Sequence, residues 1–254
     1  CTTSPAQAPA SSGAALVAAD SQVAVHDSLL DGRAGAVGGG DGGSGLVQSE
    51  GFVFAAGTEL HGGDGGHGII YTVGGVQHCT DGGDGGHGVV ATGAAPAVRV
   101  LDASIAAGLG GAGALTCPAG SPGAEVVAAP GVLQVLAGSA RSLLVDATVC
   151  DRHDAVLVAH GQPFELLVLG VSDAPGFAYS AGLKGVLLLD APSLLPLGTL
   201  DAGGDLALSL FVPQLPAAAP EAATFFLQAA FAGGGQPALG AGSALAVIKS
   251  GSCP

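Results

Sequence analysis

The chain of 254 residues contains no tryptophan and no methionine, and only 2 tyrosines and 8 phenylalanines. The large side chains that fill the wide interior of a globular domain are therefore scarce, so any core has to be built from alanine, valine, leucine and isoleucine. Such side chains fill thin, regular spaces well. The composition favours a stacked, repetitive fold, a solenoid, over a globule.

Basic residues are also scarce, with 6 Lys+Arg against 20 Asp+Glu and a net charge of −14. A nucleic-acid-binding protein needs clustered cations to displace counterions from phosphates, so this class of function is excluded. Charged residues make up only 10% of the chain, and small uncharged side chains lose little rotamer entropy when another subunit covers them. We therefore expect self-association into a homo-oligomer or polymer. The alternative explanation is a genome biased towards Ala, Gly, Val and Pro codons.

Long apolar runs are missing as well. The longest uncharged run, Ala222 to Ile248, is interrupted by the sequence GGGQP, and a spanning helix needs about 20 consecutive apolar residues. We expect no membrane span.

The cysteines are few, widely spaced and never arranged as a CxxC pair; they are Cys1, Cys79, Cys117, Cys150 and Cys253. This spacing favours disulfide bonds in an oxidising compartment over a zinc or redox motif, so we expect an extracellular or cell-surface location. The pairing stays open. Cys1 is the candidate for the odd thiol, because the extended arm 1–13, CTTSPAQAPASSG, resembles the start of a bacterial lipoprotein. Cys1 is thus a candidate lipid anchor, with a bridge to a neighbouring subunit as the alternative.

Glycine, with 46 residues, is concentrated in a repeat of the form x-G-G-D-G-G-x-G. Three copies lie at Gly38–Gly45, His61–Gly68 and Asp81–Gly88, and a degenerate copy starts at Leu109. A spacing of 20–25 residues is typical of one coil of a parallel β-helix. We therefore predict a glycine-rich parallel β-helix or solenoid over residues 14–150. In a polyproline-II-like conformation every third residue points the same way, which predicts that Asp41, Asp64 and Asp84 stack into a ladder.

Beyond residue 150 the sequence pattern changes. Short apolar runs rich in β-forming residues, such as AVLVAH, PFELLVLGV and ATFFLQAAF, alternate with Pro/Gly/Asp turns. Six or seven such strands predict a small antiparallel β-sandwich-like module over residues 151–254.

A cluster of imidazoles and carboxylates in the glycine repeats provides candidate metal ligands, namely His61, Asp64, His67, Asp81, Asp84 and His87. A divalent ion such as Zn²⁺ needs three or four ligands that converge at about 2.0–2.2 Å, whereas neighbouring strands lie about 4.8 Å apart. The alternative is therefore a solvated polar ladder. No other cofactor is expected, because the G-x-G-x-x-G motif recurs three times and leads into strands instead of a helix.

Catalytic signatures are missing from the sequence too. No nucleophile elbow is present, and in the predicted solenoid no acid pair lies beside a cation, with Arg99 and Asp102 as the one candidate exception. We expect a protein that is not an enzyme.

The GGDGGHG coils resemble the glycine-rich right-handed parallel β-helix repeat proteins of bacterial surfaces. The tail GVLLLDAPSLLPLGTLDAGGDLALSLFVPQLP with ATFFLQAAF resembles the β-rich module that often follows such repeats. This resemblance implies secretion and surface placement, and no particular activity. The sequence thus predicts a secreted structural or adhesive surface protein that self-assembles into a filament or layer. The alternative is a carbohydrate-binding or carbohydrate-cleaving β-helix protein, with a surface glycan as its ligand.

Overall fold

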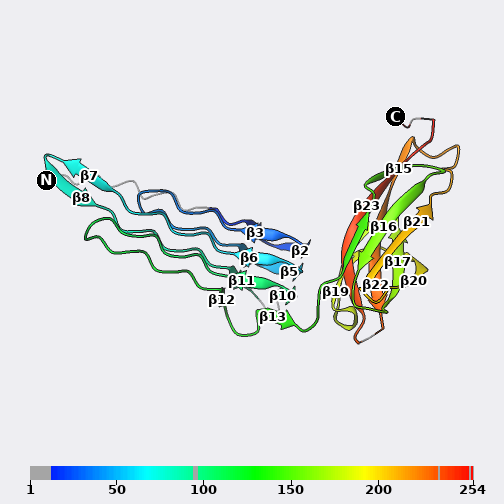
Figure 1. The fold of residues 1–254 in the computed structure, drawn as a ribbon, viewed down its shortest axis with the longest axis horizontal. Helices are drawn as coiled ribbons and strands as arrows, with labels where there is room; N and C mark the ends of the chain where they lie inside the picture. The colour runs from blue at the N-terminus through cyan, green and yellow to red at the C-terminus, as the bar shows by residue number, and fades with distance from the viewer. Residues whose placement is uncertain (1–12, 94–96, 234, 252, 254) are drawn as a thin grey trace. The chain divides into compact units, whose positions relative to one another are not determined.

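The computed structural model describes residues 13–93, 97–233, 235–251 and 253, and it confirms the all-β class. The only helix in these ranges is a short 3-10 turn, Ala181–Leu183, and no helix of the described residues is long and apolar enough to cross a membrane. The chain divides into two compact units, Cys1–Ala137 and Gly138–Pro254 (Figure 1).

In the described part of unit 1, short strands stack in parallel and form three sheets. The first sheet contains β1 (Leu16–Ala18), β4 (Leu46–Ser49), β9 (Val89–Thr92) and β12 (Val126–Ala128). The second contains β2 (Ser21–His26), β5 (Gly51–Ala56), β10 (Val98–Leu101) and β13 (Leu133–Leu136), and the third β3 (Leu29–Asp31), β6 (Glu59–His61) and β11 (Ser104–Ala106). Small aliphatic side chains from these strands form one core, including Ala18, Leu46, Val53, Ala55, Leu60, Val89, Ala91, Val98 and Val100.

Equivalent strands of unit 1 are further apart along the chain than the predicted 20–25 residues. Leu16 is paired with Leu46, Leu46 with Val89 and Val89 with Val126, so the spacings are 30, 43 and 37 residues. The predicted period was wrong because a repeat contains two glycine segments, one that runs away from the sheets and one that returns.

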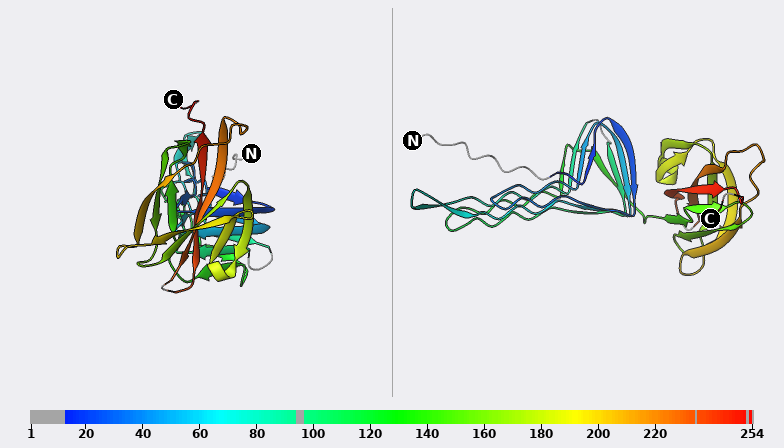
Figure 2. Two further views of the ribbon diagram at one scale, coloured as in Figure 1. Left: turned by 90° about the vertical axis from the view of Figure 1, so that its right-hand side faces the viewer. Right: turned by 90° about the horizontal axis from the view of Figure 1, so that it is seen from above.

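The glycine segments form two rows (Figure 2). The first row contains residues 32–38, 62–68 and 106–112, and the second contains residues 40–45, 80–88 and 118–125. Neighbours within a row are parallel: the Gly35 N–H donates to the Asp64 carbonyl and the Gly38 N–H to the His67 carbonyl, at 2.7 and 2.8 Å. The step of three residues on both partners is the repeat of a polyproline-II helix.

Segments of opposite rows are antiparallel. The Gly63 N–H donates to the Gly43 carbonyl and the Gly66 N–H to the Gly40 carbonyl, at 2.8 and 2.7 Å. A polyproline-II segment has no internal hydrogen bonds, so these contacts between segments are what satisfies its buried backbone groups.

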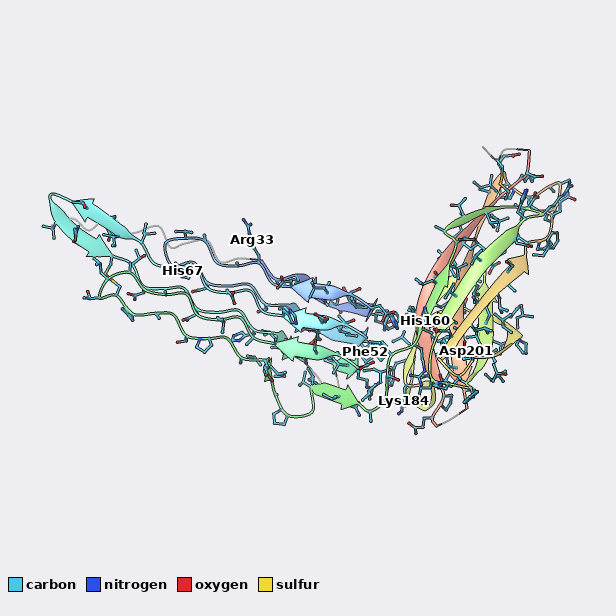
Figure 3. All side chains as sticks on the ribbon, viewed as in Figure 1. Arg33, Phe52, His67, His160, Lys184 and Asp201 are labelled. Carbon is cyan, nitrogen blue, oxygen red and sulfur yellow. A yellow bond between two sulfur atoms is a disulfide. The ribbon has the colours of Figure 1, made fainter. Side chains whose placement is uncertain are left out.

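Glycine is required on the inner side of each segment because the backbones approach so closely. A Cβ atom on Gly83 would collide with the carbonyl oxygen of Gly40, and one on Gly111 with that of Gly66. The side chains consequently sit at every third position, on the outside of the rows. Figure 3 shows how sparse they are along these segments.

Unit 2 is built from two sheets that share one apolar core (Figure 1). One sheet has the order β14 (Ser142–Val145), β16 (Asp154–His160) and β21 (Asp205–Phe211). The other has the order β15 (Thr148–Cys150), β23 (Ala238–Ile248), β22 (Ala222–Ala232), β17 (Leu166–Ser172) and β20 (Ser193–Thr199), and β18 (Pro175–Ser180) pairs with β19 (Gly185–Leu189). Pairs are antiparallel except for β15 with β23. The unit starts before residue 151 because β14 and β15 pair with β16 and β23.

The core of unit 2 contains larger side chains than that of unit 1, among them Phe231, Leu157, Leu167 and Leu169. It also holds a buried ion pair. The Arg141 Nη2 and Nε atoms donate to the two carboxylate oxygens of Glu165, each at 2.7 Å, and this fork-like geometry is the strong form of the interaction.

Candidate binding surface

The outward side chains of the glycine rows cap the backbone of the neighbouring segment. Asp64 Oδ1 accepts the Leu109 N–H at 2.8 Å, and Asp84 Oδ1 accepts the Ser121 N–H at 2.7 Å. Asp41 Oδ1 in turn accepts the Asp84 N–H at 2.9 Å. Each carboxylate thus accepts a hydrogen bond from a backbone N–H group of the next segment in its row.

Two histidines act in the same way. The Ala112 N–H donates to His67 Nδ1 at 3.2 Å, and the Ala124 N–H donates to His87 Nδ1 at 2.9 Å. An imidazole nitrogen that accepts a hydrogen bond carries no proton, so these geometries assign the tautomer with the proton on Nε2. Figure 3 shows His67 projecting outward from its glycine segment.

The predicted ladder is therefore two ladders. Asp41 and Asp84 are neighbours in the second row, whereas Asp64 lies in the first row. The rows run in opposite directions and expose opposite sides, which separates Asp64 from the other two carboxylates. The prediction that all three stack in one register was wrong for this reason.

The candidate metal ligands do not converge either. His61, Asp64 and His67 belong to the first row and its preceding strand β6, and the other candidates, Asp81, Asp84 and His87, belong to the second row. No group of three or more His, Cys, Asp or Glu side chains among the described residues is placed to hold a metal ion. Four of these side chains, Asp64, His67, Asp84 and His87, instead accept hydrogen bonds from backbone N–H groups.

A shallow polar groove of about 340 Å³ lies on the outer side of the first row. Asp31, His61 and Asp64 line it together with glycine backbone. His61 Nε2 lies 3.7 Å from the carboxylate of Glu59, and both side chains are exposed.

A β-hairpin occupies the end of the glycine rows that is remote from the three sheets (Figure 1). It consists of β7 (Ile70–Val73) and β8 (Val76–Cys79). The turn residues Gly74 and Gly75 have φ values of +59° and +84°, as a type I′ turn requires. The sequence VGGV carries this signal, but the repeat interpretation had absorbed both strands into the coils.

The base of the hairpin is fixed to the bundle. The Ile69 N–H donates to Thr80 Oγ1 at 2.8 Å, and the Thr80 N–H donates to the Ile69 carbonyl at 2.9 Å. A disulfide bond joins Cys79 to Cys117, which lies in the turn between segments 106–112 and 118–125. The hairpin is therefore held at a defined position, although an isolated two-stranded hairpin is marginally stable.

The hairpin exposes several apolar side chains. Ile70, Tyr71, Val73 and Val76 are 50%, 44%, 59% and 59% exposed, and the Tyr71 ring stacks on His78 with a centroid distance of 5.4 Å. We call residues 69–79 the hairpin tip. It contains no Asp, Glu, Lys or Arg. By the register of its strands, Tyr71, Val73 and Val76 lie on one face, and Ile70 lies on the other with Thr72 and Gln77. Exposed apolar side chains that gather on one face typically mark an interaction site.

The remaining cysteines are placed as follows. Cys150 and Cys253 form a disulfide bond in unit 2, so the two described bonds agree with the expectation of disulfides. Cys1, the candidate for a lipid anchor or an intersubunit bridge, and most of the arm 1–13 lie outside the described residues.

The polar run after Cys150 is tied to the backbone of unit 2. Asp151 is buried, and its carboxylate accepts the N–H groups of Leu215 and Ser250, each at 2.9 Å. These hydrogen bonds, chiefly the one from Leu215, hold the pKa of Asp151 below its ordinary value. Asp151 therefore fastens two loops.

Comparison with known proteins gave no match, either to a family model or to a curated sequence.

Proposed function

We propose that this chain is a secreted, non-enzymatic surface protein with an adhesive role, in which unit 1 is a glycine-rich solenoid and unit 2 a small β-sandwich. The parallel stacks β1-β4-β9-β12 and β2-β5-β10-β13 support the solenoid description. The shared core of two mainly antiparallel sheets supports the description of unit 2.

The observation that carries the adhesive role is the hairpin tip. An exposed apolar patch loses its unfavourable contact with water when a partner covers it. The glycine rows extend backbone–backbone hydrogen bonding up to the base of this hairpin, and the Cys79–Cys117 bond fixes it there. Unit 1 is thus a stiff spacer that presents a small apolar end.

Retention of protein-coated beads on polystyrene under flow tests this role. The triple variant Ile70→Thr, Val73→Thr, Val76→Thr keeps β-branched side chains but adds hydroxyl groups, so the hairpin should form while its apolar surface is lost. We expect retention to fall at least about tenfold, because each buried apolar side chain contributes about 1.5–3 kcal/mol.

The matched control is Val126→Thr with Val127→Thr on β12. These valines are 39% and 41% exposed and lie in unit 1, away from the tip. Retention should be unchanged in this control. Equal retention by the wild type and the hairpin variant would contradict the proposal, provided that circular dichroism shows both to be folded.

Self-assembly into a filament or layer remains part of the proposal. The support for it is compositional. Charged side chains at an open strand edge hinder pairing with another strand, and this chain has few of them. Within the described residues, β1 and β12 are the edges of the first sheet of unit 1, and β2 and β13 are the edges of the second.

The alternative function is binding of a surface glycan. The groove lined by Asp31, His61 and Asp64 offers carboxylates and an imidazole that can accept and donate hydrogen bonds to sugar hydroxyls. A glycan-array signal that Asp64→Ala abolishes, and that the hairpin variant leaves intact, would favour this alternative over apolar adhesion.

A further inference from the structure

Unit 2 contains a cavity of about 310 Å³ between its two sheets. All of the residues that line it are apolar, and they come from both sheets: Val145, Ala155, Leu157, Leu169, Val171, Leu195, Leu210, Phe211, Val212, Pro213, Phe225, Leu227, Leu245 and Val247. Protein interiors normally contain few voids larger than a water molecule. An apolar hollow of this size between two sheets, with the exposed Leu195 and Phe211 in its lining, therefore needs an explanation.

Water is a poor occupant of this cavity. A buried water molecule needs two to four polar partners, and cavities lined only by Leu, Ile or Phe stay dry. The volume is about twice the ~150 Å³ of an engineered apolar cavity that binds benzene. It also falls at the lower end of the range for small-molecule sites, about 300–1,000 Å³.

Two edge strands contribute exposed residues to the lining of this cavity. β20 is the edge of the five-stranded sheet and β21 is an edge of the three-stranded sheet. Leu195 on β20 and Phe211 on β21 line the cavity and are 47% and 66% exposed. β20 and β21 belong to different sheets, so an apolar molecule that enters beside Leu195 and Phe211 has no hydrogen bond between these two strands to break.

We propose that unit 2 binds one saturated hydrocarbon chain, the tail of an amphiphile, in this cavity. The lining offers no polar side chain to a hydroxyl or amide group, and such a group would lose about 2–7 kcal/mol if buried without a hydrogen bond. This excludes sugars and peptide backbones as occupants, and the polar end of the amphiphile stays outside, beyond Leu195 and Phe211. This site is independent of the hairpin tip and of the adhesive role.

The test uses N-phenyl-1-naphthylamine, whose fluorescence rises in an apolar site, with the full chain. We expect saturable binding that decanol and decanoate displace. The variant Ala155→Leu adds three carbon atoms inside the cavity, so we expect at least tenfold weaker binding and an unchanged or higher melting temperature. Val156→Leu is the matched control, because Val156 is the next residue on β16, is 47% exposed and does not line the cavity.

If Ala155→Leu does not fold, Val171→Phe on β17 serves as a second variant that fills the cavity. These two are the filling variants. Absence of saturable dye binding to the wild type, or wild-type affinity in a folded filling variant, would overturn the proposal. Co-sedimentation with phosphatidylcholine vesicles distinguishes the source of the chain. Sedimentation that the filling variants abolish identifies a bilayer lipid, whereas displacement of the dye by decanol without sedimentation identifies a free amphiphile.

Discussion

The two units hold a β-rich chain together by opposite means. The glycine rows of unit 1 rely on contacts between backbones, in which about two of every three residues donate a hydrogen bond to another segment and side chains are confined to the outside. Unit 2 relies on side chains, with Phe231 and several leucines at the centre of its core. The difference shows that a chain poor in large side chains can still form an ordered structure if its backbone groups are satisfied by neighbouring segments.

The units also differ in how they treat buried polar groups. In unit 2, Arg141 and Glu165 are buried as a bonded pair. In unit 1, His26 Nε2 and both amide atoms of Gln48 are buried without a hydrogen-bond partner among the described residues. Among its described residues, unit 1 thus combines many backbone hydrogen bonds between glycine segments with buried side-chain groups that lack a partner.

The largest effect is expected from replacing an inner glycine. Gly83→Ala places a Cβ atom against the Gly40 carbonyl, so segments 40–45 and 80–88 of the second row have to separate and lose the hydrogen bonds between them. We expect a destabilisation of more than about 4 kcal/mol, with loss of amide protection in the glycine rows by hydrogen–deuterium exchange and intact protection in unit 2. The exposed position Ala112 serves as the control, because Ala112→Val should leave protection unchanged. Normal protection in Gly83→Ala would show that backbone contact is not what holds unit 1 together.

The second prediction concerns the ion pair of unit 2. Glu165→Gln leaves the buried Arg141 guanidinium without its charged partner, which typically costs about 3–5 kcal/mol. The loss is measured by urea unfolding, with hydrogen–deuterium exchange of the amides of unit 2 as the readout. The double variant Arg141→Met, Glu165→Leu removes both charges and should recover most of the stability. If the double variant is no more stable than Glu165→Gln, the pair is not the cause.

The smallest effect is a pH dependence in unit 1. Burial lowers the pKa of His26, whose ring lies 5.6 Å from that of Phe54, to about 4 from an ordinary 6.5. The unfolded chain therefore binds more protons between these two values, and stability falls as the pH is lowered from 6.5 to 4 and levels off below. The loss is on the order of 3 kcal/mol. Burial, with a contribution from Asp102, raises the pKa of Asp27, which acts in the opposite direction.

The measurement is urea unfolding of unit 1 at a series of pH values. His26→Leu should flatten the slope between pH 6.5 and 4. If the dependence of stability on pH persists in His26→Leu, another titrating group causes it.

The sequence predicted the local features better than their arrangement. The G-G-x spacing indicated a threefold backbone and outward side chains, and the burial of Gly65 and Gly66 beside exposed Asp64 and His67 agrees with this. The repeat does not indicate the direction of a segment, because a segment that leaves the sheets and one that returns to them have the same sequence pattern. Counting Asp41, Asp64 and Asp84 as equivalent therefore halved the true period.

The candidate site could be predicted only in part. The acids and histidines of the repeat were recognised, but their partners are backbone N–H groups of segments about 40 residues away, which no spacing reveals. The pairing of Cys79 with Cys117 depends on the same long-range packing. The hairpin tip has a local signal in Gly74 and Gly75, but the surrounding glycine repeat has the same composition and obscures it.

The direction of the hydrogen bonds in the glycine rows has a mechanical consequence. They run across the segments, so a force that pulls the hairpin tip away from the three sheets loads them in shear, and many bonds share the load at once. The Cys79–Cys117 bond passes this force into a neighbouring segment before the hairpin can unzip. Unit 1 should therefore rupture at far higher force along its segments than across them.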